Sequence, residues 1–285
     1  MDLAKELAVA CALAREGGKL SLRYRCALEQ DPTQLTLQHK ADGEPVTAAD
    51  HAVNALLAEG LRAAFPQDGL LSEEMPDDGS RHTAVRAWLV DPIDGTRDFV
   101  AGRPGFAVMI GLLCAGRPVL GVVYQPMTDT LYHAVSGQGA FRCQGSAPPE
   151  RLTVSSVSNL AAVRMVSSAS HRAPVVEALR HGAGIRDEMS IGSVGIKLSL
   201  IAAGERDLYV NPTGRTKLWD TCAPEVILRE AGGELTDTCG APLRYEGPLS
   251  HPLGLVGSNG HVHKQALERL QPLLVQRKPG GGTRI

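Results

Sequence analysis

Two stretches in the first quarter of the chain repeat apolar residues at helical spacing. In the first stretch, the apolar positions are Leu3, Leu7, Cys11 and Ala14. In the second, they are Val53, Leu56, Leu57, Leu61, Ala64 and Phe65. Apolar residues three or four positions apart lie on one face of a helix. We therefore predict two amphipathic helices, each with one face in a core.

Short apolar and β-branched runs follow, and acidic residues end two of them. The run 69–72 leads into Glu73, and the run 87–90 leads into Asp91. Further β-rich runs, separated by turn-forming residues, cover 105–113, 119–125 and 130–135. Short turns between such runs favour an antiparallel meander. The pattern predicts a sheet in which two strands end in carboxylates.

The second half of the chain has a different pattern. From about residue 163, short apolar runs alternate with helical segments, which is typical of an α/β arrangement. The polar segment 148–158 separates the two patterns. We predict an α+β half over 1–155 with an antiparallel sheet and most of the acidic site residues, an α/β half over 156–276 that completes the site, and a flexible tail over 277–285.

Composition narrows the classes of partner. The chain has 285 residues, 43% of them hydrophobic, and a formal net charge of −2 with both signs interspersed. This balance gives no basic patch for nucleic acid or a membrane surface, and no stretch is apolar enough to span a bilayer. Asp2 and Glu6 interrupt any signal-peptide pattern. Six cysteines without metal-ligand spacing fit a reducing, cytoplasmic setting. We expect a small-molecule partner.

The stretch 91–96 reads Asp-Pro-Ile-Asp-Gly-Thr and suggests chemistry. Pro92 favours an extended Asp91, and Gly95 permits an unusual backbone angle before Thr96, whose N–H could face an anion. Carboxylates beside an anion require a cation between them, and hard oxygen ligands favour Mg²⁺ or Mn²⁺. The motif therefore predicts metal-assisted phosphate chemistry. The alternative is an ordinary strand-to-helix turn with Asp94 as a turn residue.

Three acidic residues elsewhere could complete such a site, and each has a structural alternative. Glu73 follows a predicted strand, but glutamates are mostly solvated surface residues. Asp220 precedes a helical segment, where aspartate is a common N-cap. Asp50 and Thr47 match a capping box, which requires no chemistry. Taken singly, none of the three requires a catalytic role.

Taken together, these motifs resemble the superfamily of inositol monophosphatases and bisphosphate nucleotidases, which are Mg²⁺-dependent, lithium-sensitive phosphatases. In chain order the matching segments are KADGEPVTAAD, LLSEE, WLVDPIDGTRDFVAGRPGFAVMIGL and LWDTCAPEVILREAGGELTD. The resemblance implies a layered αβαβα sandwich of the inositol monophosphatase and fructose-1,6-bisphosphatase type, with the metals between the two halves. It places metal ligands at Glu73, Asp91, the backbone carbonyl of Ile93, Asp94 and Asp220.

The same resemblance implies how the reaction proceeds. Asp50 and Thr96, with Glu73, would orient and activate the attacking water, and the amides of Gly95 and Thr96 would hold the phosphate oxygens. Metals that grip the entering and leaving oxygens assist in-line attack on phosphorus. Two or three Mg²⁺ ions are implied, with Mn²⁺ as a substitute and Li⁺ as an inhibitor. Relatives include monomers and homodimers.

The run 211–218, NPTGRTKL, bears on the substrate. It has no carboxylate where inositol monophosphatases hold sugar hydroxyls, and it carries Arg215 and Lys217, which suit a second phosphate. The sequence of this run resembles that of the 3′(2′),5′-bisphosphate nucleotidases of sulfur assimilation. That resemblance suggests Ser170, His171 and Lys197 as further substrate contacts, although His171 and Lys197 also fit surface residues.

We therefore predict a phosphatase that converts adenosine 3′,5′-bisphosphate (PAP) to AMP. The sulfated analogue PAPS as a competing substrate is left open. One alternative is an inositol-1-phosphatase or a broader sugar phosphatase with the same acidic core. Another is a catalytically silent protein that binds nucleotide or metal.

Overall fold

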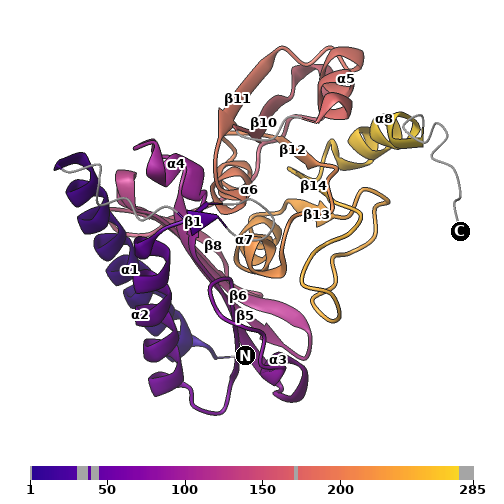
Figure 1. Cartoon of the computed structure of the whole chain (residues 1–285). Coiled ribbons are helices and arrows are strands. Elements are labelled where there is room, and N and C mark those ends of the chain that lie inside the picture. The colour runs from indigo at the N-terminus through magenta and orange to yellow at the C-terminus, as the bar shows by residue number, and fades with distance from the viewer. Residues whose placement is uncertain (1, 31–37, 40–44, 170–172, 276–285) are drawn as a thin grey trace, which may run out of the picture.

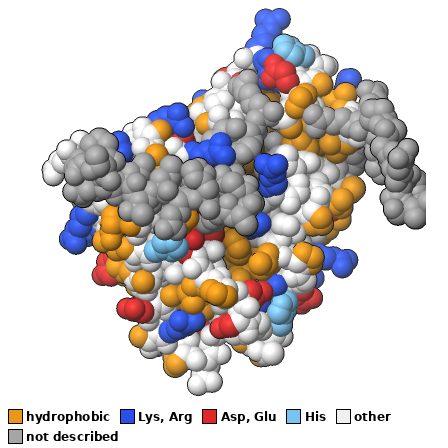
Figure 2. Space-filling model, viewed as in Figure 1, with side chains coloured by type: hydrophobic (Ala, Val, Ile, Leu, Met, Phe, Trp, Pro, Cys, Tyr) orange, Lys and Arg blue, Asp and Glu red, His pale blue; other side chains and the backbone are white. Residues whose placement is uncertain are grey.

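The computed structural model describes residues 2–30, 38–39, 45–169 and 173–275 (Figure 1). The predicted tail over 277–285 lies outside the described residues. Within them, no helix is long and apolar enough to cross a membrane. On the face shown in Figure 2, basic and acidic side chains are interspersed among apolar and other polar ones.

The first half of the chain forms a seven-stranded sheet in which neighbouring strands are also neighbours in sequence. Its strands are β3 (Gly69–Ser72), β4 (Arg86–Asp94), β5 (Ala107–Cys114), β6 (Arg117–Gln125), β7 (Thr130–Val135), β8 (Gly139–Gln144) and β9 (Glu150–Arg151). β3 and β4 are parallel, and every later pair is antiparallel. The predicted meander is confirmed. The short strands β1 (Gln38–His39) and β2 (Pro45–Val46) pair separately.

A five-stranded mixed sheet forms the second half, in the order β11-β10-β12-β14-β13. The strands are β10 (Arg164–Ser168), β11 (Asp187–Ile191), β12 (Leu208–Asn211), β13 (Glu234–Thr236) and β14 (Leu255–Ser258). β10 runs parallel to β11 and β12, and β14 runs antiparallel to both of its neighbours. Helices separate most of these strands along the chain, which agrees with the predicted α/β pattern.

Six longer helices and the two sheets form five layers (Figure 1). The outer pair α1 (Ala4–Gln30) and α2 (Ala48–Ala64) covers one face of the first sheet. The central pair α6 (Val194–Ala202) and α7 (Leu218–Glu230) packs between the sheets. The pair α5 (Pro174–Gly182) and α8 (His263–Val275) covers the far face of the second sheet. This confirms the predicted αβαβα sandwich.

The shorter helices lie in the links between strands. They are α3 (Ser80–Thr83), α4 (Thr96–Val100), η2 (Pro126–Thr128) and η3 (Leu160–Ala162). The chain passes from the first sheet to the second between β9 and β10, but both sheets share the core around α6 and α7. The division at residue 155 therefore stays a prediction.

Two glycines let α7 lie directly on the first sheet. A Cβ at Gly111 of β5 would lie 2.6 Å from the Cys222 Sγ, and one at Gly121 of β6 would lie 2.0 Å from the Ala223 carbonyl oxygen. Side chains at either position would push the helix away. Because the helix sits this close, its first turn brings Asp220 to the end of β4.

Candidate metal and phosphate site

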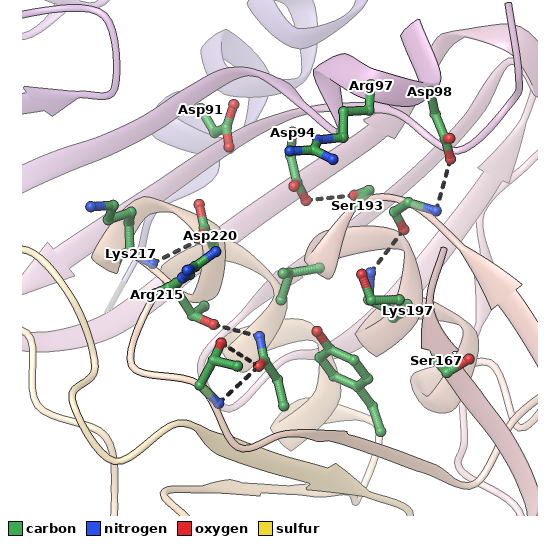
Figure 3. Close-up of a pocket in the computed structure, with 18 of the residues that line it drawn as sticks. Asp91, Asp94, Arg97, Asp98, Ser167, Ser193, Lys197, Arg215, Lys217 and Asp220 are labelled. Atoms are coloured by element: carbon green, nitrogen blue, oxygen red, sulfur yellow. Dashed lines mark hydrogen bonds between the residues drawn. The ribbon is translucent and has the colours of Figure 1, made fainter. Parts of the chain in front are cut away.

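A cavity of about 570 Å³ opens where the two halves of the chain meet (Figure 3). The first half contributes the ends of β3 and β4 and the start of α4, and the second half contributes α6 and the segment between β12 and α7. Of the residues predicted from sequence, the cavity is lined by Glu73, Asp91, Ile93, Asp94, Gly95, Thr96, Lys197, Arg215, Lys217 and Asp220. Residues from four distant segments therefore share one cavity.

The end of β4 turns sharply into α4 and directs two aspartates at this cavity. The pairing of β4 with β5 shifts register between Asp91 and Asp94, around Pro92, which has no N–H to donate. Gly95 then has φ 99°, in the left-handed region. A Cβ there would lie 2.4 Å from the Gly105 carbonyl oxygen, so only glycine fits. We call residues 91–96 the acidic corner.

Four carboxylates lie at this cavity, of which Asp91 is buried and Glu73, Asp94 and Asp220 are half-buried. Burial raises the pKa of Asp91 well above its usual value, and the charges of Glu73, Asp94 and Asp220 raise it further. Burial likewise raises the pKa of Asp220, with Asp94 and Glu73 adding to the effect. Like charges raise each other's pKa only at short range. The four carboxylates therefore lie near enough for their charges to affect one another.

Backbone donors hold two of these acids in place. The Ile93 N–H donates to Asp91 Oδ1 at 3.0 Å, and the Lys217 N–H donates to Asp220 Oδ2 at 2.8 Å. The suggested N-cap role for Asp220 is wrong, because Lys217 occupies the N-cap position of α7 and Asp220 is the third helical residue. Its carboxylate reaches back to the cap residue from within the first turn.

The donor set fits a hard divalent cation. Carboxylate oxygens are preferred ligands of Mg²⁺, and a cation would offset the repulsion that raises these pKa values. The groups that would hold it are the carboxylates of Glu73, Asp91, Asp94 and Asp220 and the carbonyl of Ile93. In the part of the chain that the structure describes, no three His, Cys, Asp or Glu side chains are already grouped round one point. The fit therefore rests on charge and donor type.

Asp50 lies beside the acidic corner, next to Thr96. The Thr96 hydroxyl lies 3.3 Å from Asp50 Oδ1 and 3.2 Å from the Ile93 carbonyl oxygen, and it can donate to either. The other oxygen of Asp50 accepts the Thr47 N–H at 2.8 Å, which completes the capping box of α2. The capping-box interpretation of Asp50 is therefore confirmed, and its other oxygen faces Thr96, while a catalytic role stays a prediction.

The run 211–217, which begins at the last residue of β12, forms the wall opposite the acidic corner. Arg215 is exposed and Lys217 is half-buried. The run is held from behind through its backbone: Lys217 forms a β-bridge with Ser250, and the His251 N–H donates to the Thr216 carbonyl oxygen at 2.9 Å. The backbone is thus fixed while the two cationic side chains extend along the cavity wall (Figure 3).

Lys197 is buried rather than solvated. Its side chain is 2% exposed, and its ammonium donates to the carbonyl oxygens of Gly192 at 3.0 Å and Ile191 at 3.3 Å. It also lies 5.1 Å from the centre of the Tyr209 ring. Burial lowers the pKa of Lys197 to about 8, while the charge of Asp94 opposes that shift. The ammonium is thus engaged with the protein's own carbonyl groups.

Sequence reasoning missed the roles of Ser193, which contacts Asp94, and of Asp98, which contacts Gly192. Ser193 donates through Oγ to Asp94 Oδ2 at 2.6 Å and accepts the Ile196 N–H as the N-cap of α6. A serine before a helical segment is an N-cap signal that could have drawn attention to it. Asp98 is buried and accepts the Gly192 N–H at 2.9 Å. No local pattern predicts that second contact.

Two predicted substrate contacts, Ser170 and His171, lie outside the described residues. Their nearest described neighbours in the cavity wall are Ser167 and Ser168, at the end of β10. Arg97, which follows the acidic corner, also lines the cavity (Figure 3). The cavity thus carries a cation next to the acidic corner as well as Arg215 and Lys217 on the opposite wall.

Known proteins resemble this chain over nearly its whole length. Residues 2–277 match the inositol monophosphatase family. A histidinol-phosphatase of Mycobacterium tuberculosis is 36% identical over 270 residues, which cover 93% of this chain and 97% of that protein. The 3′(2′),5′-bisphosphate nucleotidase CysQ of Escherichia coli is 35% identical over 240 residues, 82% of this chain and 92% of that protein. Relatives named for two different substrates thus stand at similar identity.

Solved structures agree with the fold. The extragenic suppressor protein suhB of Bartonella henselae superposes with a TM-score of 0.81 at 25% identity and covers 94% of this chain and 98% of its own. CysQ of Bacteroides thetaiotaomicron, titled a bacterial member of the inositol monophosphatase family, gives 0.73 at 29% identity and covers 90% and 97%. The five layers are therefore shared with these proteins.

Proposed function

We propose that this chain, which belongs to the inositol monophosphatase family, releases the 3′-phosphate of PAP to give AMP. Membership of the family makes it a phosphomonoesterase that acts on a small phosphate ester. One observation carries the choice of substrate. Among the described residues that line the cavity, the basic ones are Arg97, Lys197, Arg215 and Lys217. Arg215 and Lys217 lie on the wall opposite the acidic corner, where a second anionic group would be held.

The proposed chemistry uses the acidic corner. Divalent cations, Mg²⁺ by proposal, would be held by the four carboxylates and the Ile93 carbonyl. When bound, they supply neutralising charge for the phosphate and lower the pKa of water. The N–H groups of Gly95 and Thr96 remain the predicted donors to the phosphate oxygens.

The Asp50 and Thr96 pair would handle the proton of the attacking water. Thr96 Oγ1 lies within hydrogen-bond distance of Asp50 Oδ1, so the hydroxyl can accept from water while it donates to the carboxylate. Asp50 would then receive the proton at Oδ1. A protein that only binds nucleotide or metal has no need of this pair. The contact between Asp50 and Thr96 therefore supports catalysis over silent binding.

A second candidate function is hydrolysis of histidinol phosphate, because the relative from Mycobacterium tuberculosis carries that name. Histidinol phosphate has an ammonium group and an imidazole away from its phosphate. A wall that carries Arg215 and Lys217 would repel that ammonium group, whereas the same wall would attract the 5′-phosphate of PAP. Inositol 1-phosphate, a neutral polyol apart from its phosphate, would gain little from either cation.

Phosphate release tests the proposal directly. The purified protein is assayed with Mg²⁺ on PAP, histidinol phosphate, inositol 1-phosphate and fructose 1,6-bisphosphate, and kcat/KM is compared. We expect the highest value for PAP. A higher value for histidinol phosphate or inositol 1-phosphate would discard the substrate assignment and keep the reaction class.

A further inference from the structure

The link between β11 and α6 is gripped from both sides by buried charged residues. Residues 191–193 form this link, which we call the 191–193 turn. Asp98, from the first half of the chain, accepts the Gly192 N–H at Oδ2 over 2.9 Å. Lys197, from α6, donates to the Gly192 carbonyl oxygen at 3.0 Å. A buried anion and a buried cation therefore hold the two peptide groups of one glycine.

The turn also touches the acidic corner through its backbone. A Cβ at Gly192 would lie 2.2 Å from the Gly105 carbonyl oxygen and 2.5 Å from Asp98 Oδ2. A Cβ at Gly95 would lie 2.4 Å from the same carbonyl oxygen and 3.1 Å from the Ser193 nitrogen. Glycines at all three positions permit this approach. A displacement of the turn would therefore reach the corner without any intervening side chain.

Ser193 transmits the position of the turn to Asp94. It has φ 50°, in the left-handed region that residues other than glycine rarely adopt. Such a conformation persists only where the surroundings determine it. Held this way, the Ser193 Oγ donates to Asp94 Oδ2 at 2.6 Å, and the Gly195 N–H donates to the same oxygen at 3.0 Å. One oxygen of the carboxylate is thereby fixed.

The surroundings of Lys197 account for its burial without a substrate. An ammonium buried to this degree must be paired, and it has two carbonyl oxygens and the face of Tyr209. The charges of Asp94 and Asp98 also favour its protonated form. Groups of the protein therefore pair the Lys197 ammonium by themselves, and no substrate phosphate is needed to pair it.

We propose that Lys197 and Asp98 are positioning residues that hold the 191–193 turn, so that Ser193 fixes one oxygen of Asp94 and leaves the other for a divalent cation. This inference rests on the metal site of the proposed function. It replaces the expected contact between Lys197 and the substrate. It also links the two halves of the chain, because Asp98 and Asp94 belong to the first and Ser193 and Lys197 to the second.

The proposal is tested by measuring Mn²⁺ binding in the absence of substrate. The electron paramagnetic resonance signal of the free ion reports how much Mn²⁺ is unbound. We expect Ser193→Ala and Lys197→Met each to weaken Mn²⁺ binding by about 10- to 100-fold. The double variant should bind no more weakly than the worse single variant, because both act through one turn. The KM for PAP at saturating Mg²⁺ should stay near the wild-type value. A raised KM for Lys197→Met with unchanged Mn²⁺ binding would overturn the proposal in favour of a substrate contact.

Two controls separate the possible failures. Ser199→Ala alters a fully buried residue of the same helix whose hydroxyl has no partner among the described residues, and it should bind Mn²⁺ like wild type. Asp94→Asn tests the metal site itself. If it leaves Mn²⁺ binding unchanged, the proposed site is wrong. If it weakens binding while Ser193→Ala and Lys197→Met do not, only the positioning role is wrong. Should Lys197→Met not fold, Asp98→Ala, which removes the acceptor for the Gly192 N–H, takes its place with the same expected direction.

Discussion

The acidic corner and the run 211–217 face each other across one cavity, and they are built in opposite ways. Asp91 and Ile93 in the corner are 2% and 1% exposed, and the backbone there is fixed by a register shift and by a glycine in the left-handed region. In the run, Arg215 is exposed, and its neighbours are held by backbone pairing with the 250–251 segment and by side-chain hydrogen bonds among Asn211, Thr213 and Thr216.

This difference separates the chemistry of the site from its selectivity. Side chains of the corner are packed and hydrogen-bonded to several elements, so a substitution there disturbs the whole arrangement. The exposed Arg215 of the run can change while the backbone stays paired. A family built this way can keep one reaction and change its ester. Two relatives named for different substrates at similar identity to this chain fit that view.

The largest expected effect comes from breaking the corner. Asp94→Asn keeps an acceptor for Ser193 but removes one charge from the proposed metal ligands. Stabilisation of transition-state charge by such a site is worth several kcal/mol, so we expect kcat for phosphate release to fall by about a thousandfold. Asp187→Asn, which alters an exposed acid paired with Arg206, is the matched control and should leave kcat unchanged. Retention of most activity by Asp94→Asn would remove the corner from the reaction.

Much of the corner could be predicted from sequence because local rules determine it. Proline after Asp91 favours an extended strand end, and glycine after Asp94 permits an unusual backbone angle; β4 does run to Asp94, and Gly95 has a left-handed backbone. The strand ends that carry Glu73 and Asp91 followed from apolar runs, whereas the five-layer fold was expected only from the family resemblance. The motifs shared with the family then brought in Asp220, which lies far away in the sequence.

The support behind the corner could not be predicted in this way. Ser193 contacts Asp94 across 99 positions of sequence, and Asp98 contacts Gly192 across 94. Lys197 occupies a helix, where a lysine ordinarily lies in solvent, yet it is 2% exposed because the turn and Tyr209 enclose it. Such contacts depend on how two sheets pack through shared helices, which no short pattern records.

The next largest effect should come from the run and should depend on the ester. Replacing both cations in Arg215→Gln/Lys217→Gln removes charge-assisted hydrogen bonds worth about 1.5–3 kcal/mol each when well formed. Because Arg215 is exposed, we expect the lower range, a fall in kcat/KM for PAP of about 10- to 100-fold. Activity on inositol 1-phosphate, which offers no second anion, should change little.

Lys264→Gln is the matched control for that pair, because Lys264 is an exposed lysine on α8 away from the cavity. Its kcat/KM for PAP should equal that of wild type. An equal loss on PAP and inositol 1-phosphate in the double variant would mean that the run supports the reaction itself. The contrast between the two walls would then disappear.

The smallest effect sharpens the contrast through stability. In the metal-free protein, burial and the neighbouring acids raise the pKa of Asp91 above its unfolded value. The folded state therefore holds this proton to higher pH than the unfolded state, and stability falls as pH rises from the unfolded pKa through the folded pKa. Asp91→Asn removes this loss. We expect the difference in Tm between Asp91→Asn and wild type to be about 2–4 °C more positive at neutral pH than at low pH. This shift corresponds to about 1 kcal/mol in a chain of this size.

Melting curves in a chelator at several pH values measure this difference, and Arg215→Gln provides the comparison from the other wall. Its charge is exposed to solvent, so removing it should leave the pH profile of Tm like that of wild type. Added Mg²⁺ should stabilise the wild type most at neutral pH, where the acids of the corner are most strained by their mutual repulsion, and should stabilise Asp91→Asn less. A pH profile shifted equally by both substitutions would show that the two walls share one electrostatic environment, and the separation of chemistry from selectivity would then lose its physical basis.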